Sequence, residues 1–412
     1  MVRTYKCPGC GGALEYDPLD ERMHCAFCGS SYAPEEVSNR STYAPGNAGS
    51  LNEAERNRMD DTRSRATIRM NIAVCSSCGG ELAMEAKEVS SFCPYCGNAT
   101  VVMDRVEEQL APDYVIPFKV GQDEAEALIR NRLKSGFFVP KAIKNFELEK
   151  LRGIYIPFWL YDMYYGADQK WKYKVSSGKH STTYYAHVTG DCTFHHLTVD
   201  ASWAFNDDSS QRLEPYDMKA LRPFDATYLS GFYSDRFDVG YRSADKIAIT
   251  RSNEMYDESV KKYIQKSDAK LEENRTKMDI FRRNYALLPV WFLTFRHDNY
   301  PYTVLLNGQT KKMVAAVPVD KKKAIGVFTL FAAAFCILFG IIGGFLMAAI
   351  LSNNSRHSSS KDGPEKLLIY WIVGTVLIWS IAIKHFISLR KSIELSRSRT
   401  NNRLAKERQD RV

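Results

Sequence analysis

The chain has 412 residues, 45% of them hydrophobic, which is enough to bury a sizeable core and to form several domains. Its formal net charge is +8, but residues 384–412 alone contribute nine Lys or Arg against three acids, or +6. The rest of the chain is therefore close to neutral, which argues against a general attraction to nucleic acid as the meaning of the charge.

Two copies of one cysteine motif occupy the N-terminal quarter of the chain. Each copy has two Cys-x2-Cys pairs separated by 14 residues, and the second copy follows the first at a distance of 68 positions. Two such pairs can place four thiolates in a tetrahedron, so the spacing predicts two zinc ribbons, 1–36 and 70–104, and two Zn²⁺ ions. Four disulfides in a secreted module are the alternative, which the ribbon spacing disfavours. The predicted ligands are Cys7, Cys10, Cys25, Cys28, Cys75, Cys78, Cys93 and Cys96.

Four thiolate ligands leave a zinc ion no open position, so we expect structural rather than catalytic metal. Glycine follows the second cysteine of every pair, where a tight turn favours a left-handed backbone. The loops within both ribbons are net acidic: the first carries Arg22 against four acids, and the second carries Lys87 against three. That sign disfavours phosphate binding. His24 lies beside Cys25, and we expect it to be a bystander rather than a ligand.

A polar linker, 37–69, joins the two ribbons, and a β-rich cytosolic domain is expected over 105–320. Within it, apolar spacing predicts a short amphipathic helix over 123–133. The charged stretch 252–281 predicts a long surface helix that Ser252 caps.

Alternating aromatic and β-branched residues predict antiparallel strands in the same domain. A hairpin turn is predicted at Asn307-Gly308, between two strands. The similar segments IPFWL at 156–160 and LPVWF at 288–292 suggest an internal duplication. The predicted strands cover residues 153–165, 171–175, 182–188, 192–205, 287–295, 302–306 and 312–317.

The domain contains no G-x4-G-K-[ST], G-x-S-x-G or H-E-x2-H motif, so we predict neither catalytic residues nor enzyme activity. Cys192, His195 and His196, with His187 nearby, form the one cluster of candidate ligands or of a nucleophile and its base. Neighbouring residues of a strand point to opposite faces, so at most one of His195 and His196 can join Cys192. Ordinary strand side chains are the favoured interpretation.

Two apolar runs follow this domain. A bilayer span takes roughly 20 apolar residues, so the runs predict transmembrane helices over 324–351 and 367–389, joined by an extracytoplasmic loop, 352–366. Lysines precede the first run and a basic tail, 390–412, ends the chain, so the positive-inside rule places both termini in the cytoplasm. We therefore expect a multi-pass protein of the cell membrane.

Two contacts of these segments follow from their composition. The basic tail is expected to bind anionic membrane lipids. Gly340 and Gly344 form a small-residue face in the first apolar run, which favours close packing of the two helices as a hairpin or of two chains as a homo-oligomer.

Several segments of the chain carry a resemblance when they occur together. The combination, with a terminal membrane hairpin, resembles a family of double-zinc-ribbon membrane proteins, chiefly from Gram-positive bacteria, often labelled homologues of the replication-restart helicase. The helicase label conflicts with the missing nucleotide-binding motif. Lys311 departs from the glycine that we expect after NGQT. The segments are CPGCGG at 7–12, CAFCG at 25–29, CSSCGG at 75–80, CPYCG at 93–97, VIPF at 115–118, IPFWLYD at 156–162, LPVWFL at 288–293 and NGQT at 307–310.

The resemblance implies recruitment of phage-shock-protein-A-like and SPFH-type partners rather than catalysis. The expected fold is multidomain α+β: two small β zinc ribbons, a mixed α/β cytosolic domain with an antiparallel sheet, and a C-terminal transmembrane helical hairpin. The expected function is a membrane-anchored scaffold or adaptor that docks cytosolic proteins at the cytoplasmic face, in membrane stress response. A membrane-tethered nucleic-acid-binding or transcription-regulatory protein is the alternative.

Overall fold

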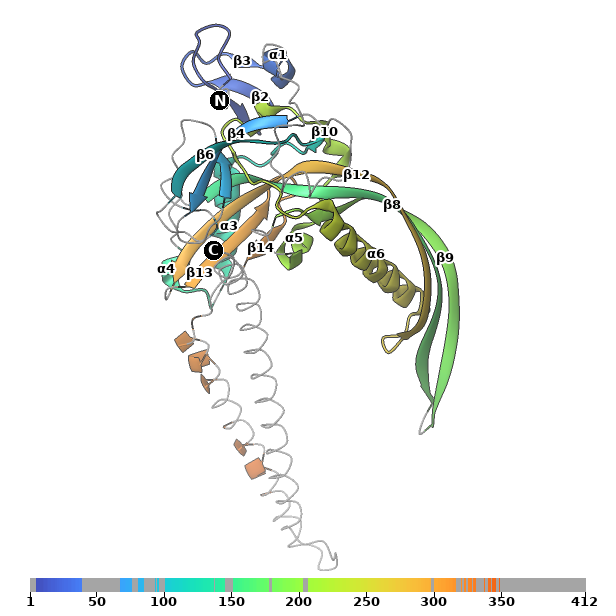
Figure 1. Ribbon diagram of the computed structural model, residues 1–412. Coiled ribbons are helices and arrows are strands. Elements are labelled where there is room, and N and C mark those ends of the chain that lie inside the picture. The colour runs from blue at the N-terminus through green and yellow to red at the C-terminus, as the bar shows by residue number, and fades with distance from the viewer. Residues whose placement is uncertain are drawn as a thin grey trace, which may run out of the picture. The chain divides into compact units, whose positions relative to one another are not determined.

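The computed structural model describes most of the chain up to residue 315 (Figure 1). The described residues fall into two compact units, one drawn from residues up to 129 and from 147–315, the other from 130–146 and the positions after 315. The described residues are 5–38, 67–75, 81–84, 93, 95, 101–136, 138–144, 151–177, 180–202, 207–297, 300–315, 320 and individual positions between 322 and 348.

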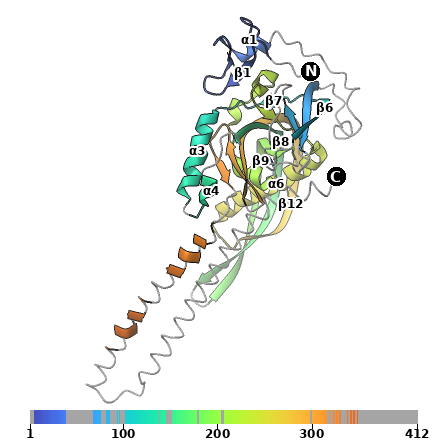
Figure 2. The same ribbon diagram turned by 90° about the vertical axis from the view of Figure 1, so that its left-hand side faces the viewer.

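The N-terminal segment forms a small antiparallel sheet with the order β1-β2-β3. It consists of β1 (Leu14–Asp17), β2 (Arg22–Cys25) and β3 (Ser31–Tyr32), followed by the short helix α1 (Pro34–Ser38). Alternate residues of β1 and β2 are buried, because successive side chains of a strand point to opposite faces. Figure 2 shows this sheet as distinct from the strands of the large sheet.

Eleven strands form the large sheet, and three of them, β8, β9 and β12, have 27, 21 and 28 residues. The main path runs β10-β7-β12-β8-β11-β5-β4-β6, while β13 pairs with β12, β14 with β13 and β9 with β8. The strands are β4 (Thr67–Cys75), β5 (Glu81–Met84), β6 (Val101–Leu110), β7 (Tyr114–Val115), β8 (Leu151–Ser177), β9 (His180–Asp200), β10 (Arg222–Pro223), β11 (Tyr233–Ser234), β12 (Lys270–His297), β13 (Tyr300–Asn307) and β14 (Met313–Ala315).

The core lies where the first part of β8 pairs with the last part of β12. The two similar segments noted in the sequence are antiparallel neighbours here, with Ile156 opposite Leu288. Each contains a proline, which donates no backbone hydrogen bond. The Pro157 carbonyl accepts from the N–H of Ala201 at 2.9 Å, and the Pro289 carbonyl accepts from Gly308 at 2.9 Å. Buried side chains of both segments form one apolar cluster.

The other halves of β8, β9 and β12 form a long curved arm, and α6 (Tyr241–Ile264) packs against its concave side (Figure 1). The helix buries Ala244, Ala248 and Ser252, which follow each other at intervals of four and so share one face. Trp171 of β8 lies between helix and sheet in an apolar cluster with Val260. The arm is therefore a sheet with one covered face and one solvated face.

The arm bends at Asp162, where both neighbouring strands carry a register irregularity. On β9 the irregularity faces the step from Tyr161 to Met163, and on β12 it lies between Ile280 and Arg282. An extra residue in one strand bends it and increases its twist. Asp162 is buried and accepts the N–H of His196 at 2.8 Å.

Besides α6, one longer helix, α3, and several short helices are described. The helix predicted over 123–133 is confirmed as α3 (Gln122–Ser135). The predicted hairpin at Asn307 is also confirmed, because β13 ends there and pairs with β14. Lys311 takes the left-handed conformation, with φ of 63°, at the position where we expected glycine. The other short helices are α4 (Lys141–Lys144), α5 (Asp207–Leu213), η3 (Met218–Ala220) and η4 (Ala226–Leu229).

The long helix predicted over 252–281 is wrong. The helix begins eleven residues earlier, at Tyr241, and ends where Gln265 takes the left-handed conformation. Residues from Lys270 onward belong to β12. They are mostly charged and mostly exposed, because this part of the strand runs along a solvated arm rather than through the core. Their composition was mistaken for that of a surface helix.

The predicted fold class also needs correction: the described part of the protein is mostly β, with one large, curled, largely antiparallel sheet and few helices. Within the part of the chain that the structure describes, no helix has both the length and the apolarity that crossing a bilayer requires. The predicted transmembrane hairpin is thus contradicted, and with it the multi-pass cell-membrane location. Residues 352–366, 367–389 and 390–412, and most of 324–351, lie outside the described residues.

Candidate metal centre

Two tight turns carry the first four cysteines, and both have the same hydrogen bonding. In the first, the N–H of Gly11 donates to the Cys7 carbonyl at 2.8 Å, and in the second, Gly29 donates to Cys25 at 2.9 Å. Both glycines have a left-handed backbone, with φ of 77° and 72°, as the sequence predicted. The repeated turn directs the two thiols of each pair to one side of the backbone.

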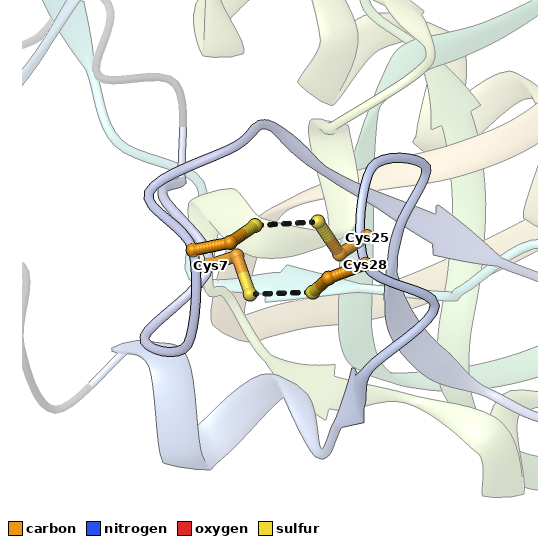
Figure 3. A group of neighbouring side chains, drawn as sticks. Cys7, Cys25 and Cys28 are labelled. Atoms are coloured by element: carbon orange, nitrogen blue, oxygen red, sulfur yellow. Dashed lines mark hydrogen bonds between the residues drawn. The ribbon is translucent and has the colours of Figure 1, made fainter.

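The turns face each other and bring the four sulfur atoms together (Figure 3). The Sγ atoms of Cys7 and Cys28 lie 3.5 Å apart, as do those of Cys10 and Cys25, and all four lie within 4.8 Å of one another. A tetrahedron with Zn–S bonds of about 2.3 Å has S–S edges of about 3.8 Å. The cluster therefore has the size and the donor set to hold one metal ion.

The electrostatics of the thiols favour a bound cation. Hydrogen bonds with the side chain and backbone of Ser30 lower the pKa of Cys28 to about 6. A backbone hydrogen bond from Gly12 lowers the pKa of Cys10, but its contacts with the thiols of Cys28 and Cys25 outweigh this effect and raise the pKa to about 12. Four sulfur atoms this close cannot all be thiolates without a positive charge among them, and a bound metal ion would supply that charge.

Side chains around the cluster hold it in place. The Tyr32 hydroxyl lies 3.7 Å from Cys7 Sγ. Arg22 of β2 hydrogen-bonds to Ser31, the residue before Tyr32 in β3: Arg22 Nε lies 3.1 Å from Ser31 Oγ, and Nη2 lies 3.2 Å from the Ser31 carbonyl oxygen. Cys7 and Cys25 are buried, whereas Cys10 and Cys28 are exposed. The cysteine cluster therefore lies at the surface of its own small sheet, with two of its four cysteines exposed.

The ribbon packs against a distant part of the chain, which the sequence did not predict. Tyr16 meets Tyr228 of η4 edge to face, with ring centroids 5.3 Å apart. Ser230 Oγ donates to the Leu14 carbonyl at 2.6 Å, and the N–H of Tyr16 donates to the Ser230 carbonyl at 3.3 Å. The partners are more than 200 residues apart, and no local signal marks them.

A second group of possible metal ligands lies beside the cluster and consists of Asp17, Asp20 and His24. His24 Nε2 lies 2.7 Å from Asp20 Oδ2, so this ring pairs with a carboxylate rather than with the four thiols. Asp17 and Asp20 also accept backbone N–H groups of the turn, from Leu19 and Arg22 respectively. These bonds account for the acidic residues as turn formers.

The second cysteine motif is described only in part. Cys75, at the end of β4, and Cys93 are both buried, and Tyr95 packs against them. Cys78 and Cys96 lie outside the described residues, so the second set of ligands stays a prediction. The strands β4, β5 and β6 of this region belong to the large sheet, which β5 joins by the pair Ala83 and Ser234.

The cysteine and histidines of β9 do not converge. Cys192 is half-buried, and its burial and then the neighbouring Asp191 raise its pKa, which is the wrong direction for a nucleophile. His195 is largely exposed, with Nδ1 3.9 Å from Asp162 Oδ1. Among the described residues, the groups that could hold a metal do not include this cluster.

Comparison with known proteins adds one relative. The chain is similar to the uncharacterized protein YdjG of Bacillus subtilis (strain 168), with 26% identity over 370 residues that cover 84% of this chain and 96% of YdjG. No family model matches the chain, and no solved structure does. The alignment therefore covers most of both chains, but the name of the relative states no activity.

Proposed function

We propose that the protein is an adaptor whose metal-stabilised N-terminal ribbon docks a partner protein. The proposal rests on the exposure of Phe27. This residue is 78% exposed although it lies between Cys25 and Cys28 of the cysteine cluster. Its ring packs over Gly12, where an added Cβ would lie 2.6 Å from Phe27 Cδ2. An exposed aromatic side chain on a rigid turn is a typical anchor of a protein interface.

The metal chemistry supports docking rather than catalysis. We propose that the ion is Zn²⁺, because four sulfur ligands at tetrahedral spacing suit it best, and that the second cysteine motif holds another. With four thiolates the ion has no position for water or substrate. The chemistry that zinc supplies when bound is structural: it holds two turns together in a sheet that is too small to have much core.

The charge around the anchor suggests the chemistry of the partner. Glu15, Asp20 and Glu21 are exposed on the same small sheet, and α1 adds Glu35 and Glu36. A partner with an apolar pocket for Phe27 and a basic rim would match this surface, whereas a phosphate backbone would be repelled. By the resemblance described above, phage-shock-protein-A-like and SPFH-type proteins are the partner classes to test first.

The test measures the affinity of the metal-loaded full chain for purified proteins of these two classes by biolayer interferometry. Phe27→Ala should weaken binding at least about tenfold, as the loss of an interface anchor does. Tyr263→Ala is the matched control, because Tyr263 is a similarly exposed aromatic residue (79%) on α6 and should have no effect. Equal affinities of wild type and Phe27→Ala would refute docking at this site, and retention of nucleic acid instead of protein at physiological salt would favour the alternative.

A further inference from the structure

Strand β9 forms one lateral edge of the arm. Among the described strands, β9 pairs with β8 alone, so within that part of the chain the N–H and C=O groups on one side of its backbone have no strand partner. A strand of this kind is a template for a further strand. At about 3.3 Å per residue the 21 residues of β9 span about 70 Å.

Natural proteins normally protect such an edge with lysine or proline, and β9 lacks both. Its sequence, HSTTYYAHVTGDCTFHHLTVD, contains no Lys, Arg or Pro. The opposite side of the arm is protected: the first fourteen residues of β12, KLEENRTKMDIFRR, include eight charged ones. The two edges of one arm therefore differ, and β9 is the one suited to pairing.

The open edge is accessible on one face as well. Residues with odd numbers from 187 to 195 are exposed, whereas the even-numbered ones between them are half-buried toward α6. Ala186 and Val188 of the inner set pack into the cluster around Trp171. The helix thus covers inner side chains of β9, and the outer face is solvated.

The sequence of β9 is complementary to itself in the antiparallel direction. A two-fold axis through Thr189 places His187 of one chain opposite Asp191 of the other, and it does so twice. It also places Tyr184, which is 48% exposed, opposite Phe194. Hydrogen-bonding pairs, such as a histidine facing an aspartate, and aromatic pairs in directly facing positions each stabilise a sheet. The ladder between β8 and β9 is regular over 180–194, so this stretch is straight enough to add a strand.

We propose that two copies of this chain pair through their β9 edges, antiparallel and centred on Thr189. The interface is isologous, since each chain contributes the same edge, and it closes into a dimer rather than a filament. It extends the three-stranded arm into a six-stranded sheet. The proposal does not depend on the metal centre or on the partner discussed above.

Sedimentation velocity of the full chain over a range of concentrations tests the dimer. Thr189→Lys puts two lysines opposite each other at the axis, and should weaken the dimer roughly tenfold or more. Thr276→Lys is the matched control: Thr276 is an exposed threonine of β12 on the protected side of the same arm, and its substitution should leave the dimer intact.

Introduced charges at the facing positions 187 and 191 then test the register. His187→Asp creates two facing carboxylate pairs and should dissociate the dimer, while His187→Asp combined with Asp191→Lys should restore it. A wild type that is monomeric at all concentrations would overturn the proposal. So would a dimer that tolerates Thr189→Lys, or a double variant as weak as His187→Asp, since pairing would then lie on another surface or in another register. Thermal melts confirm that each variant is folded.

Discussion

Removal of the metal should unfold the ribbon and leave the large sheet intact. Structural zinc contributes about 10–16 kcal/mol to the folding of small zinc modules, which have almost no core without it. The contacts between the ribbon and η4 are few by comparison. The edge-to-face pair of Tyr16 and Tyr228 is worth about 0.5–1.5 kcal/mol beyond its buried area, and the hydrogen bond from Ser230 to Leu14 is worth a similar amount.

The ribbon and the large sheet should therefore respond very differently to removal of the metal. Loss of these two contacts and of the hydrogen bond from the Tyr16 N–H to the Ser230 carbonyl costs the body of the protein about 1.5–4.5 kcal/mol, which is less than the roughly 5–15 kcal/mol that stabilises a typical domain. Hydrogen exchange before and after chelation measures this directly: amides of β1 and β2 should lose protection, and those of β8 and β12 in the core should keep it. Cys28→Ser should act like chelation, and Cys192→Ser, on the arm, should have no effect.

One result would refute this reasoning. If the core amides of β8 and β12 lost protection together with the ribbon, the metal would stabilise the whole first unit, and the contacts with η4 would be far stronger than their geometry indicates. Unchanged protection of β1 and β2 after chelation would equally contradict it, since the ribbon would then fold without metal.

Two further substitutions probe the large sheet. Trp171→Ala should lower the free energy of unfolding by roughly 3–5 kcal/mol, because the buried indole fills the space between α6 and the arm; a loss below about 1 kcal/mol in urea denaturation would contradict this packing. Gly308→Ala places a Cβ 2.6 Å from the Phe118 ring and should cost roughly 1–3 kcal/mol in the same assay. Adding Phe118→Leu should recover part of that cost, and a Gly308→Ala protein as stable as wild type would argue against the close contact.

Local patterns predicted local structure well. The cysteine spacing located the cluster of four cysteines that could hold a metal ion, the glycine at position 11 predicted a left-handed turn, and Asn307 predicted the hairpin between β13 and β14. The apolar spacing of α3 was sufficient because one face of the helix is buried and the other is not. In each case the residues that determine the structure are neighbours in the sequence.

The predictions that failed depend on the solvent exposure of a segment or on contacts between residues far apart in the sequence. The start of β12 is charged because the arm is solvated, and composition alone could not separate such a strand from a surface helix. The apolar run from 324 was assigned by length, and the described residues give no helix that meets the requirement. The packing of Tyr16 on Tyr228 joins segments whose relation exists only in the folded chain.

The outermost section of the arm, beyond Lys174, whose N–H donates to Asp268, is a two-stranded hairpin in the described part of the chain. Beyond Lys172, which pairs with the first residue of β12, the ladder continues between β8 and β9 alone, as far as Ser177 and His180. Side chains alternate between faces with a period of two, so deleting two facing pairs shortens the arm by about 7 Å and leaves the orientation of every other residue unchanged. Related chains can therefore differ in the reach of this hairpin while keeping the same core, the same bend at Asp162 and the same seat for α6.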